Sequence, residues 1–265
     1  MACLVKEKAI IELGDELYAA LLNRTVVEPP TSRFADITVN DAYRVSERML
    51  ARRIAAGEML VGRKIGLTSS AVQKYFGVDE PDVGNLTDAM QFPNGAEVPI
   101  SERLIQPKAE GEIAFVLKSN LRGPGVTAAD VLEATDYVAP CFEIVDSRVR
   151  DWKIRIEDTV ADNASCGLFV IGDDHADPRE LDLSACEMEV MTDGEIVARG
   201  TGAAALGSPL ICVAWLANAL GANGMELRSG DVILSGSLTP VVPATPGTHM
   251  VVSIAGIGNA SIRFS

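Results

Sequence analysis

Histidine is scarce in this chain of 265 residues, and its five cysteines form no Cys-x-x-Cys pair. The only histidines are His175, in a polar stretch, and His249, after a Pro-Gly turn, so we expect both at the surface. This scarcity excludes a histidine-rich metal site and argues against Ser-His-Asp or Cys-His catalysis. The odd number and wide spacing of the cysteines are typical of reduced, buried thiols rather than of disulfides or a zinc site.

Three further absences narrow the class of protein. No glycine-rich nucleotide-binding loop follows a predicted strand, and no block of lysine or arginine occurs in a chain whose net charge is −14. Nucleic acid and anionic membrane surfaces are therefore not expected as partners. We find no run of about 18 apolar residues and no signal-peptide pattern, so we expect no membrane span and a cytoplasmic location.

The composition is that of a globular protein, with 48% hydrophobic and 23% charged residues. Apolar residues recur at helical spacing through 6–23 and again through 40–56, where Asn40 is the expected N-cap. A third short helix is predicted at 70–76. We therefore predict an α+β fold with a small helical N-terminal region, 1–77, and a mainly antiparallel β-rich catalytic domain, 78–265.

The second region is rich in short β-type runs separated by Gly, Pro and Asn. Strands are predicted near 111–117, 140–145, 167–171, 187–192, 195–199, 231–235, 249–254 and 260–264. Asp193-Gly194 predicts a hairpin turn between two of them. Two helices interrupt the strands, at about 128–137 and at 209–221, with Ser208 as the expected cap of the latter.

Two glutamates separated by one residue, Glu110 and Glu112, begin an apolar strand. Side chains at i and i+2 of a strand point to the same face, so the two carboxylates crowd together. Like charges on an apolar strand repel and are costly to desolvate unless a cation lies between them. A divalent metal with oxygen ligands, Mg²⁺ or Mn²⁺, would meet this need, whereas a solvent-exposed edge strand is the alternative.

Three other polar residues lie in apolar or glycine-rich surroundings. Lys64 could extend to the surface or face a cleft. Asp82 lies in a loop bounded by Pro and Gly, where an Asx turn is the simplest local interpretation. Glu143 lies within an apolar strand and is the natural third oxygen ligand, although Arg148 could pair with it instead.

Several short motifs occur in order along the chain: Lys64-Ile-Gly-Leu-Thr68, Pro81-Asp82-Val-Gly84, Glu110-Gly-Glu112, Phe142-Glu-Ile-Val-Asp-Ser147, Asp151-Trp-Lys-Ile154, Thr159-Val-Ala-Asp-Asn-Ala-Ser-Cys-Gly167 and Gly230-Asp-Val-Ile-Leu234. Together they resemble the 2-hydroxypenta-2,4-dienoate (2-keto-4-pentenoate) hydratases of catechol meta-cleavage pathways, within the fumarylacetoacetate hydrolase-like superfamily. The resemblance covers nearly the whole chain, and the joint order of the motifs is specific. One departure is Ser208, where many relatives have histidine between Gly and Pro.

The resemblance implies a fumarylacetoacetate hydrolase-like fold and carries over residue by residue. By this resemblance the metal-binding carboxylates are Glu110, Glu112 and Glu143. The polar active-site residues are Lys64 and Asp82, and the substrate-contacting serine is Ser165. It also implies Mg²⁺ or Mn²⁺ as the cofactor and a homo-oligomer, and association with the related decarboxylase is possible.

The implied reaction is metal-dependent addition of water to 2-hydroxypenta-2,4-dienoate, giving 4-hydroxy-2-oxopentanoate in aromatic degradation. On this hypothesis Lys64 offsets excess negative charge and relays a proton, Asp82 orients or deprotonates water, and Ser165 binds the substrate. The alternatives are 4-oxalocrotonate decarboxylase, another C–C bond-cleaving member of the superfamily, or a binding protein without metal. The decarboxylase would share the same metal carboxylates and lysine.

Overall fold

The computed structural model describes residues 2–265, with side chains from residue 6 onward, so the side chain of Cys3 lies outside the description. The α-helices are α1 (Ala2–Asn23), α2 (Pro30–Arg33), α3 (Val39–Ala55), α4 (Ser70–Phe76), α5 (Ile100–Arg103), α6 (Ala128–Ala134), α7 (Ile156–Ala161) and α8 (Pro209–Ala222). The strands are β1 (Leu60–Gly66), β2 (Asp82–Thr87), β3 (Gln91–Phe92), β4 (Glu97–Val98), β5 (Pro107–Leu117), β6 (Thr135–Asp146), β7 (Cys166–Ile171), β8 (Glu187–Thr192), β9 (Glu195–Thr201), β10 (Val232–Leu234), β11 (Val242–Pro243), β12 (His249–Ile254) and β13 (Gly258–Phe264).

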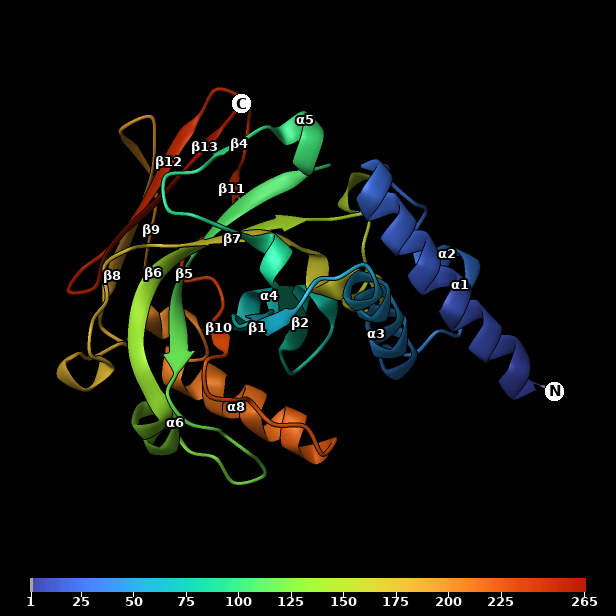
Figure 1. Cartoon of the computed structure of the whole chain (residues 1–265), viewed down its shortest axis with the longest axis horizontal. Coiled ribbons are helices and arrows are strands. Elements are labelled where there is room, and N and C mark those ends of the chain that lie inside the picture. Colours follow the sequence, from blue (N-terminus) through green and yellow to red (C-terminus); the bar gives the residue numbers. More distant parts are fainter. Residues whose placement is uncertain (1) are drawn as a thin grey trace.

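Two sheets form the body of the molecule (Figure 1). The larger sheet has the order β2-β1-β10-β5-β6-β7-β3, with β11 also paired to β5, and the smaller has the order β4-β13-β12-β8-β9. The pairs β1–β10, β3–β7 and β4–β13 are parallel, and the remaining pairs are antiparallel. The predicted α+β fold with mainly antiparallel strands is confirmed.

Gly111, between the two glutamates of β5, faces the smaller sheet. A Cβ at this position would lie 2.7 Å from Met188 Sδ of β8 in the smaller sheet, so a larger residue would require neighbouring side chains to shift. Ile113 and Phe115 continue this face into the shared core of the two sheets. The alternation of the strand therefore directs Glu110 and Glu112 to the opposite face, away from the smaller sheet.

The N-terminal helices α1 and α3 pack together with α7 at one side of the sheets (Figure 1). Their buried side chains form a separate core made of Ile10, Leu13, Leu17, Tyr18, Ala42, Val45, Met49, Val160 and Ala161. The predicted helices are present, but Thr38 and not Asn40 caps α3, in a capping box with Asp41. The region 1–77 also contributes β1, a strand of the larger sheet.

The eight predicted strands are present, whereas β1, β2, β3, β4 and β11 were not predicted. The helix predicted at 128–137 ends at Ala134, because the β-type sequence from Thr135 to Val138 begins β6. Asp193 and Gly194 form the hairpin between β8 and β9, with φ of 50° and 86°. Ser208 stands at the N-cap of α8, but its side chain makes no capping hydrogen bond. Cys141, Cys166, Cys186 and Cys212 are free and buried, as expected.

One stretch, Gly202–Ala222, is long and apolar enough to cross a membrane by length and composition alone. Its regular part, α8, has 14 residues, or about 21 Å at 1.5 Å per residue, short of a hydrocarbon core of about 30 Å. One face of α8 is buried in the main core, through residues such as Cys212, Val213 and Leu216. We therefore interpret α8 as a core helix.

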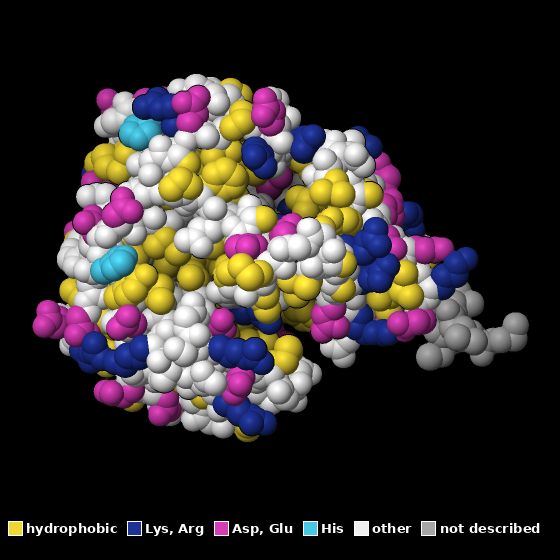
Figure 2. All heavy atoms as spheres, in the orientation of Figure 1, with side chains coloured by type: hydrophobic (Ala, Val, Ile, Leu, Met, Phe, Trp, Pro, Cys, Tyr) yellow, Lys and Arg dark blue, Asp and Glu magenta, His cyan; other side chains and the backbone are white. Residues whose placement is uncertain are grey.

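The charged side chains on the face drawn in Figure 2 are dispersed, without a basic patch.

Candidate active site

Three carboxylates meet on the larger sheet. The antiparallel register of β5 and β6 places Glu110 directly opposite Glu143, and Glu112 follows two residues along the same face. One oxygen from each of the three lies within 4.8 Å of the others. Glu112 and Glu143 are buried and Glu110 is half-buried, so the arrangement is not the solvated edge strand considered above.

The carboxylate oxygens of this cluster are poorly satisfied within the described chain. Oε1 of Glu112 and both oxygens of Glu143 are buried without a hydrogen-bond partner. Oε2 of Glu112 accepts a hydrogen bond of 2.7 Å from the backbone N–H of Gly236. Buried carboxylates without donors are costly unless a cation is bound, and an all-oxygen donor set suits a hard divalent ion. The residues present therefore fit a divalent metal.

Lys64 of β1 is the cation closest to this cluster among the described residues. Its Nζ lies 3.3 Å from Oε1 of Glu143, and its side chain is buried rather than extended to the surface. Burial alone would lower the pKa of Lys64, but the carboxylates of Glu143 and Asp82 outweigh this effect and raise the pKa. Lys64 is therefore protonated at neutral pH and supplies a fixed positive charge.

Asp82, at the start of β2, faces the same space. It pairs with Gly66 of β1, where a Cβ would lie 2.2 Å from Oδ1 of Asp82 and 3.1 Å from Nζ of Lys64. Glycine at this position leaves the room in which the two side chains meet. Oδ1 of Asp82 is buried without a partner, and burial raises the pKa of this carboxyl group. Asp82 is therefore a buried acid beside Lys64 and not a residue of a surface Asx turn.

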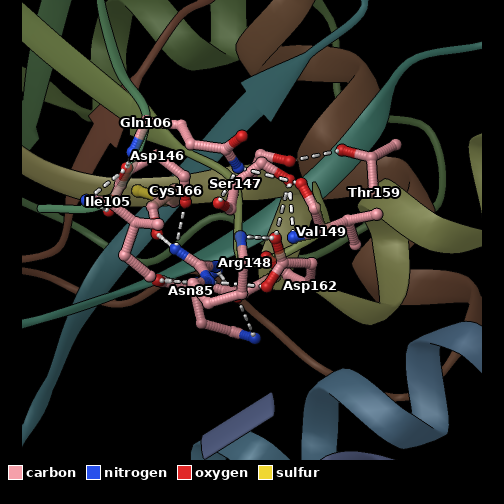
Figure 3. Close-up of polar contacts among 12 residues, drawn as sticks. Asn85, Ile105, Gln106, Asp146, Ser147, Arg148, Val149, Thr159, Asp162 and Cys166 are labelled. Carbon is pink, nitrogen blue, oxygen red and sulfur yellow. Dashed lines mark hydrogen bonds and ion pairs between the residues drawn. The ribbon is translucent and has the colours of Figure 1, made fainter. Parts of the chain in front are cut away.

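Arg148 does not pair with Glu143, so that alternative is wrong. Its guanidinium instead donates a 2.5 Å hydrogen bond to Oδ1 of Asp162 (Figure 3). Ser165 lies at the end of a turn that follows α7, and its hydroxyl is 3.1 Å from that of Thr159. Both hydroxyl side chains are buried.

A cavity of about 850 Å³ joins these groups, with Lys64, Asp82, Glu110, Thr159 and Ser165 among its lining residues. Tyr75 and Phe76 of α4 contribute to its apolar wall. Neither histidine lines it: His175 is exposed, and His249 is half-buried in β12. The cavity thus combines charged and hydroxyl groups with an apolar wall.

Lys108 and Thr159 are among the polar lining residues that sequence reasoning missed. Lys108 lies on the same face of β5 as the glutamates, two residues before Glu110, so the period of the strand could have revealed it. Its Nζ lies 4.0 Å from the centre of the Trp152 ring, a cation–π contact. Thr159 could not have been found from spacing, because its contact with Ser165 depends on the turn between them.

Comparison with known proteins agrees with this geometry. Residues 65–265 match the family model described as fumarylacetoacetate (FAA) hydrolase C-terminal. The chain belongs to this family. Among curated relatives, a 2-hydroxypent-2,4-dienoate hydratase of Pseudomonas putida is 62% identical over 83% of this chain and 99% of the relative. A 2-hydroxyhexa-2,4-dienoate hydratase of Comamonas testosteroni is 52% identical over 98% of this chain and all of the relative, 100%.

A solved structure of the same family has nearly the same fold. The 4-oxalocrotonate decarboxylase from Pseudomonas putida G7, complexed with magnesium and adipate, superposes with a TM-score of 0.95 and 39% identity, covering 98% of each chain. Hydratase-like and decarboxylase-like members of this family thus share one scaffold, and the fold alone does not separate the two reactions.

The stability of the metal-free protein should depend on pH through the glutamate cluster. Burial, together with the charge of Glu143, raises the pKa of Glu110 from its usual 4.5 to about 7. The contribution of this group to stability is therefore complete below pH 4.5 and is lost as the pH rises through 7. We expect the Tm of protein in EDTA to fall between pH 5 and 8 by more than that of protein saturated with Mg²⁺. Parallel profiles with and without metal would contradict this prediction, and Glu110→Gln should reduce the difference.

Proposed function

We propose that this protein is a metal-dependent hydratase that adds water to 2-hydroxypenta-2,4-dienoate, the enol of 2-oxopent-4-enoate, to give 4-hydroxy-2-oxopentanoate in the degradation of aromatic compounds. The observation that carries the proposal is the convergence of three carboxylates beside Lys64. One of them, Glu110, lines the same cavity as Lys64 and Asp82. The 62% identity to a hydratase of this substrate class supports the choice of reaction.

Glu110, Glu112 and Glu143 would hold the divalent metal, for which we propose Mg²⁺ or Mn²⁺ because all donors are carboxylate oxygens. When bound, the ion supplies Lewis acidity that stabilises negative charge on the substrate 2-oxygen. Three carboxylates exceed a 2+ ion by one negative charge, and an anionic substrate adds to the excess. The buried ammonium of Lys64 offsets it, which is why its position beside Glu143 matters.

The other polar side chains of the site have separate roles in the proposed reaction. Asp82 has a free buried oxygen and a raised pKa, so it orients the water that adds at C4 and accepts a proton from it. Lys64 stabilises charge that develops on the dienolate and relays a proton from solvent to substrate carbon. Ser165 donates a hydrogen bond to the substrate, and Thr159 orients the serine hydroxyl.

Decarboxylation is the second candidate, because the decarboxylase superposes with a TM-score of 0.95. That reaction starts from a dicarboxylate and must expel CO₂, whereas hydration retains every carbon. Both reactions can use the same carboxylate cluster, so the cluster does not discriminate between them. The difference must lie around C4 and C5 of the substrate, where Asp82 and the 162–167 segment approach the cavity.

Product analysis in D₂O tests the choice. We expect loss of the dienoate chromophore, solvent deuterium on carbon in 4-hydroxy-2-oxopentanoate, and retention of all carbons. The paired assay measures CO₂ released from 2-oxohex-3-enedioate under the same conditions. Faster release of CO₂ than hydration of the pentadienoate would reject the hydratase assignment and leave the metal site standing.

We also propose that the enzyme acts in the cytoplasm as a homo-oligomer and can associate with the related decarboxylase. The acidic surface and the reduced state of the described cysteines are compatible with a cytosolic protein. Light scattering of the purified protein, alone and mixed with the decarboxylase, measures both kinds of assembly.

A further inference from the structure

The turn between α7 and β7 has an unusual backbone. Asn163, Ala164 and Ser165 have φ of 56°, 50° and 52°, so three consecutive residues with a Cβ are left-handed. This conformation costs energy for each such residue, and asparagine tolerates it best. Runs of this kind persist only where the surroundings hold them, and this one ends at the serine that lines the cavity.

The side chain of Asn163 holds the turn against β2, the edge strand of the larger sheet. Its Oδ1 accepts hydrogen bonds from the backbone N–H of Asn85 at 2.8 Å and from Nδ2 of the same residue at 3.2 Å. Its Nδ2 donates to the carbonyl oxygen of Asn85 at 2.9 Å. The side-chain amide thus pairs with the backbone N–H and C=O of Asn85, as a neighbouring strand would.

The approach is close as well as hydrogen-bonded. A Cβ at Gly84 would lie 2.9 Å from the carbonyl oxygen of Asn163 and 2.9 Å from Cγ of Lys64. The turn therefore packs on the same glycine as the stem of the lysine, and a displaced turn would move the wall of the active site.

Arg148 holds both ends of the turn from the other side (Figure 3). Its guanidinium donates to Oδ1 of Asp162, directly before the turn, and to the carbonyl oxygen of Cys166, directly after it, at 2.5 Å and 2.9 Å. Its backbone N–H also donates to Oδ2 of Asp162 at 2.8 Å. With the ends fixed in this way, the hydrogen bonds of the Asn163 amide to Asn85 hold the middle of the turn on β2.

We propose that Asn163 is a positioning residue for hydration, acting through Ser165: its amide holds the left-handed turn on β2 and so aims the serine hydroxyl at the substrate. This inference rests on the proposed function. Asn163 is not itself among the residues lining the cavity, so it acts without touching substrate.

The test removes the amide while keeping the backbone conformation. Asn163→Gly adopts positive φ freely but loses the hydrogen bonds to Asn85. We expect kcat to fall by about 10- to 100-fold, the effect of misplacing a positioning group. Asn218→Ala is the matched control, because the Asn218 side chain makes the same paired bonds to the backbone of Val126 outside the cavity. It should lower Tm and leave kcat unchanged.

A double-mutant cycle shows whether Asn163 acts through the serine. In a Ser165→Ala background, Asn163→Gly should lower kcat by less than about threefold, because its target is already missing. Full loss in both backgrounds, or an Asn163→Gly variant with lowered Tm and normal kcat, would overturn the inference.

The same cycle is run on the Kd of the unreactive analogue 2-oxopentanoate with Mg²⁺, which needs no turnover. A wild-type protein that binds the analogue but hydrates no dienoate would refute the proposed function, and the cycle in Kd would then decide the role of Asn163. A wild-type protein that neither binds the analogue nor hydrates the dienoate would overturn both the proposed function and the role of Asn163.

Discussion

Replacing Lys64 with alanine should lower kcat by at least about 100-fold, the low end of what a positioned acid–base or charged group contributes. The ammonium lies 3.3 Å from Glu143, where it balances an excess of buried negative charge that grows when an anionic substrate binds. Its raised pKa means that its charge is present throughout the neutral range, so the loss should not be recovered by changing the pH between 6 and 9. Steady-state kinetics with the dienoate measures the effect.

Two exposed lysines provide controls for this prediction. Lys74 lies on α4 and Lys118 just after β5, and neither lines the cavity. Alanine at either position should change kcat by less than about twofold, as surface substitutions away from a site usually do. Near-normal kinetics of Lys64→Ala, with the metal still bound, would show that the lysine only stabilises the fold and has no part in the reaction.

The sequence is most informative about the carboxylates. The period of β5 alone places Glu110 and Glu112 on one face, which predicts either a cation between the two charges or a solvent-exposed edge strand. For Glu143, the third member of the cluster, the sequence allows two interpretations: a metal ligand or an ion pair with Arg148. Only the register of β5 against β6 and the contact of Arg148 with Asp162 decide between these possibilities.

Other parts of the site could not be derived from local pattern. β1 carries Lys64 but contains two glycines, which are poor strand formers, so its sequence gave no strand signal. Those glycines are present because neighbouring groups approach too closely for a Cβ, and such contacts are non-local. The left-handed turn before Ser165 likewise depends on Asn85 and Arg148, which are distant in sequence.

Glu112→Gln should abolish tight metal binding and yet stabilise the metal-free protein. Two unit charges 4 Å apart interact by about 4 kcal/mol at an effective dielectric constant of 20, which is almost a thousandfold in an equilibrium constant. Part of this is returned because the amide is easier to bury, so we expect the Kd for Mg²⁺ to rise at least about 100-fold, with a matching loss of activity. Titration calorimetry and kinetics at saturating Mg²⁺ measure the two effects.

The same substitution removes a carboxyl group whose pKa is raised well above 4.5 by burial and by the neighbouring Glu143, so folding of the metal-free protein no longer bears the cost of burying or protonating it. The glutamine can still accept the hydrogen bond from Gly236, so the Tm in EDTA should increase. Glu143→Gln should weaken metal binding equally but lower the Tm, because it leaves the ammonium of Lys64 buried without its closest carboxylate. Equal Tm changes in the two variants would contradict this view of the cluster, and normal metal-dependent turnover in either would remove that residue from the ligand set.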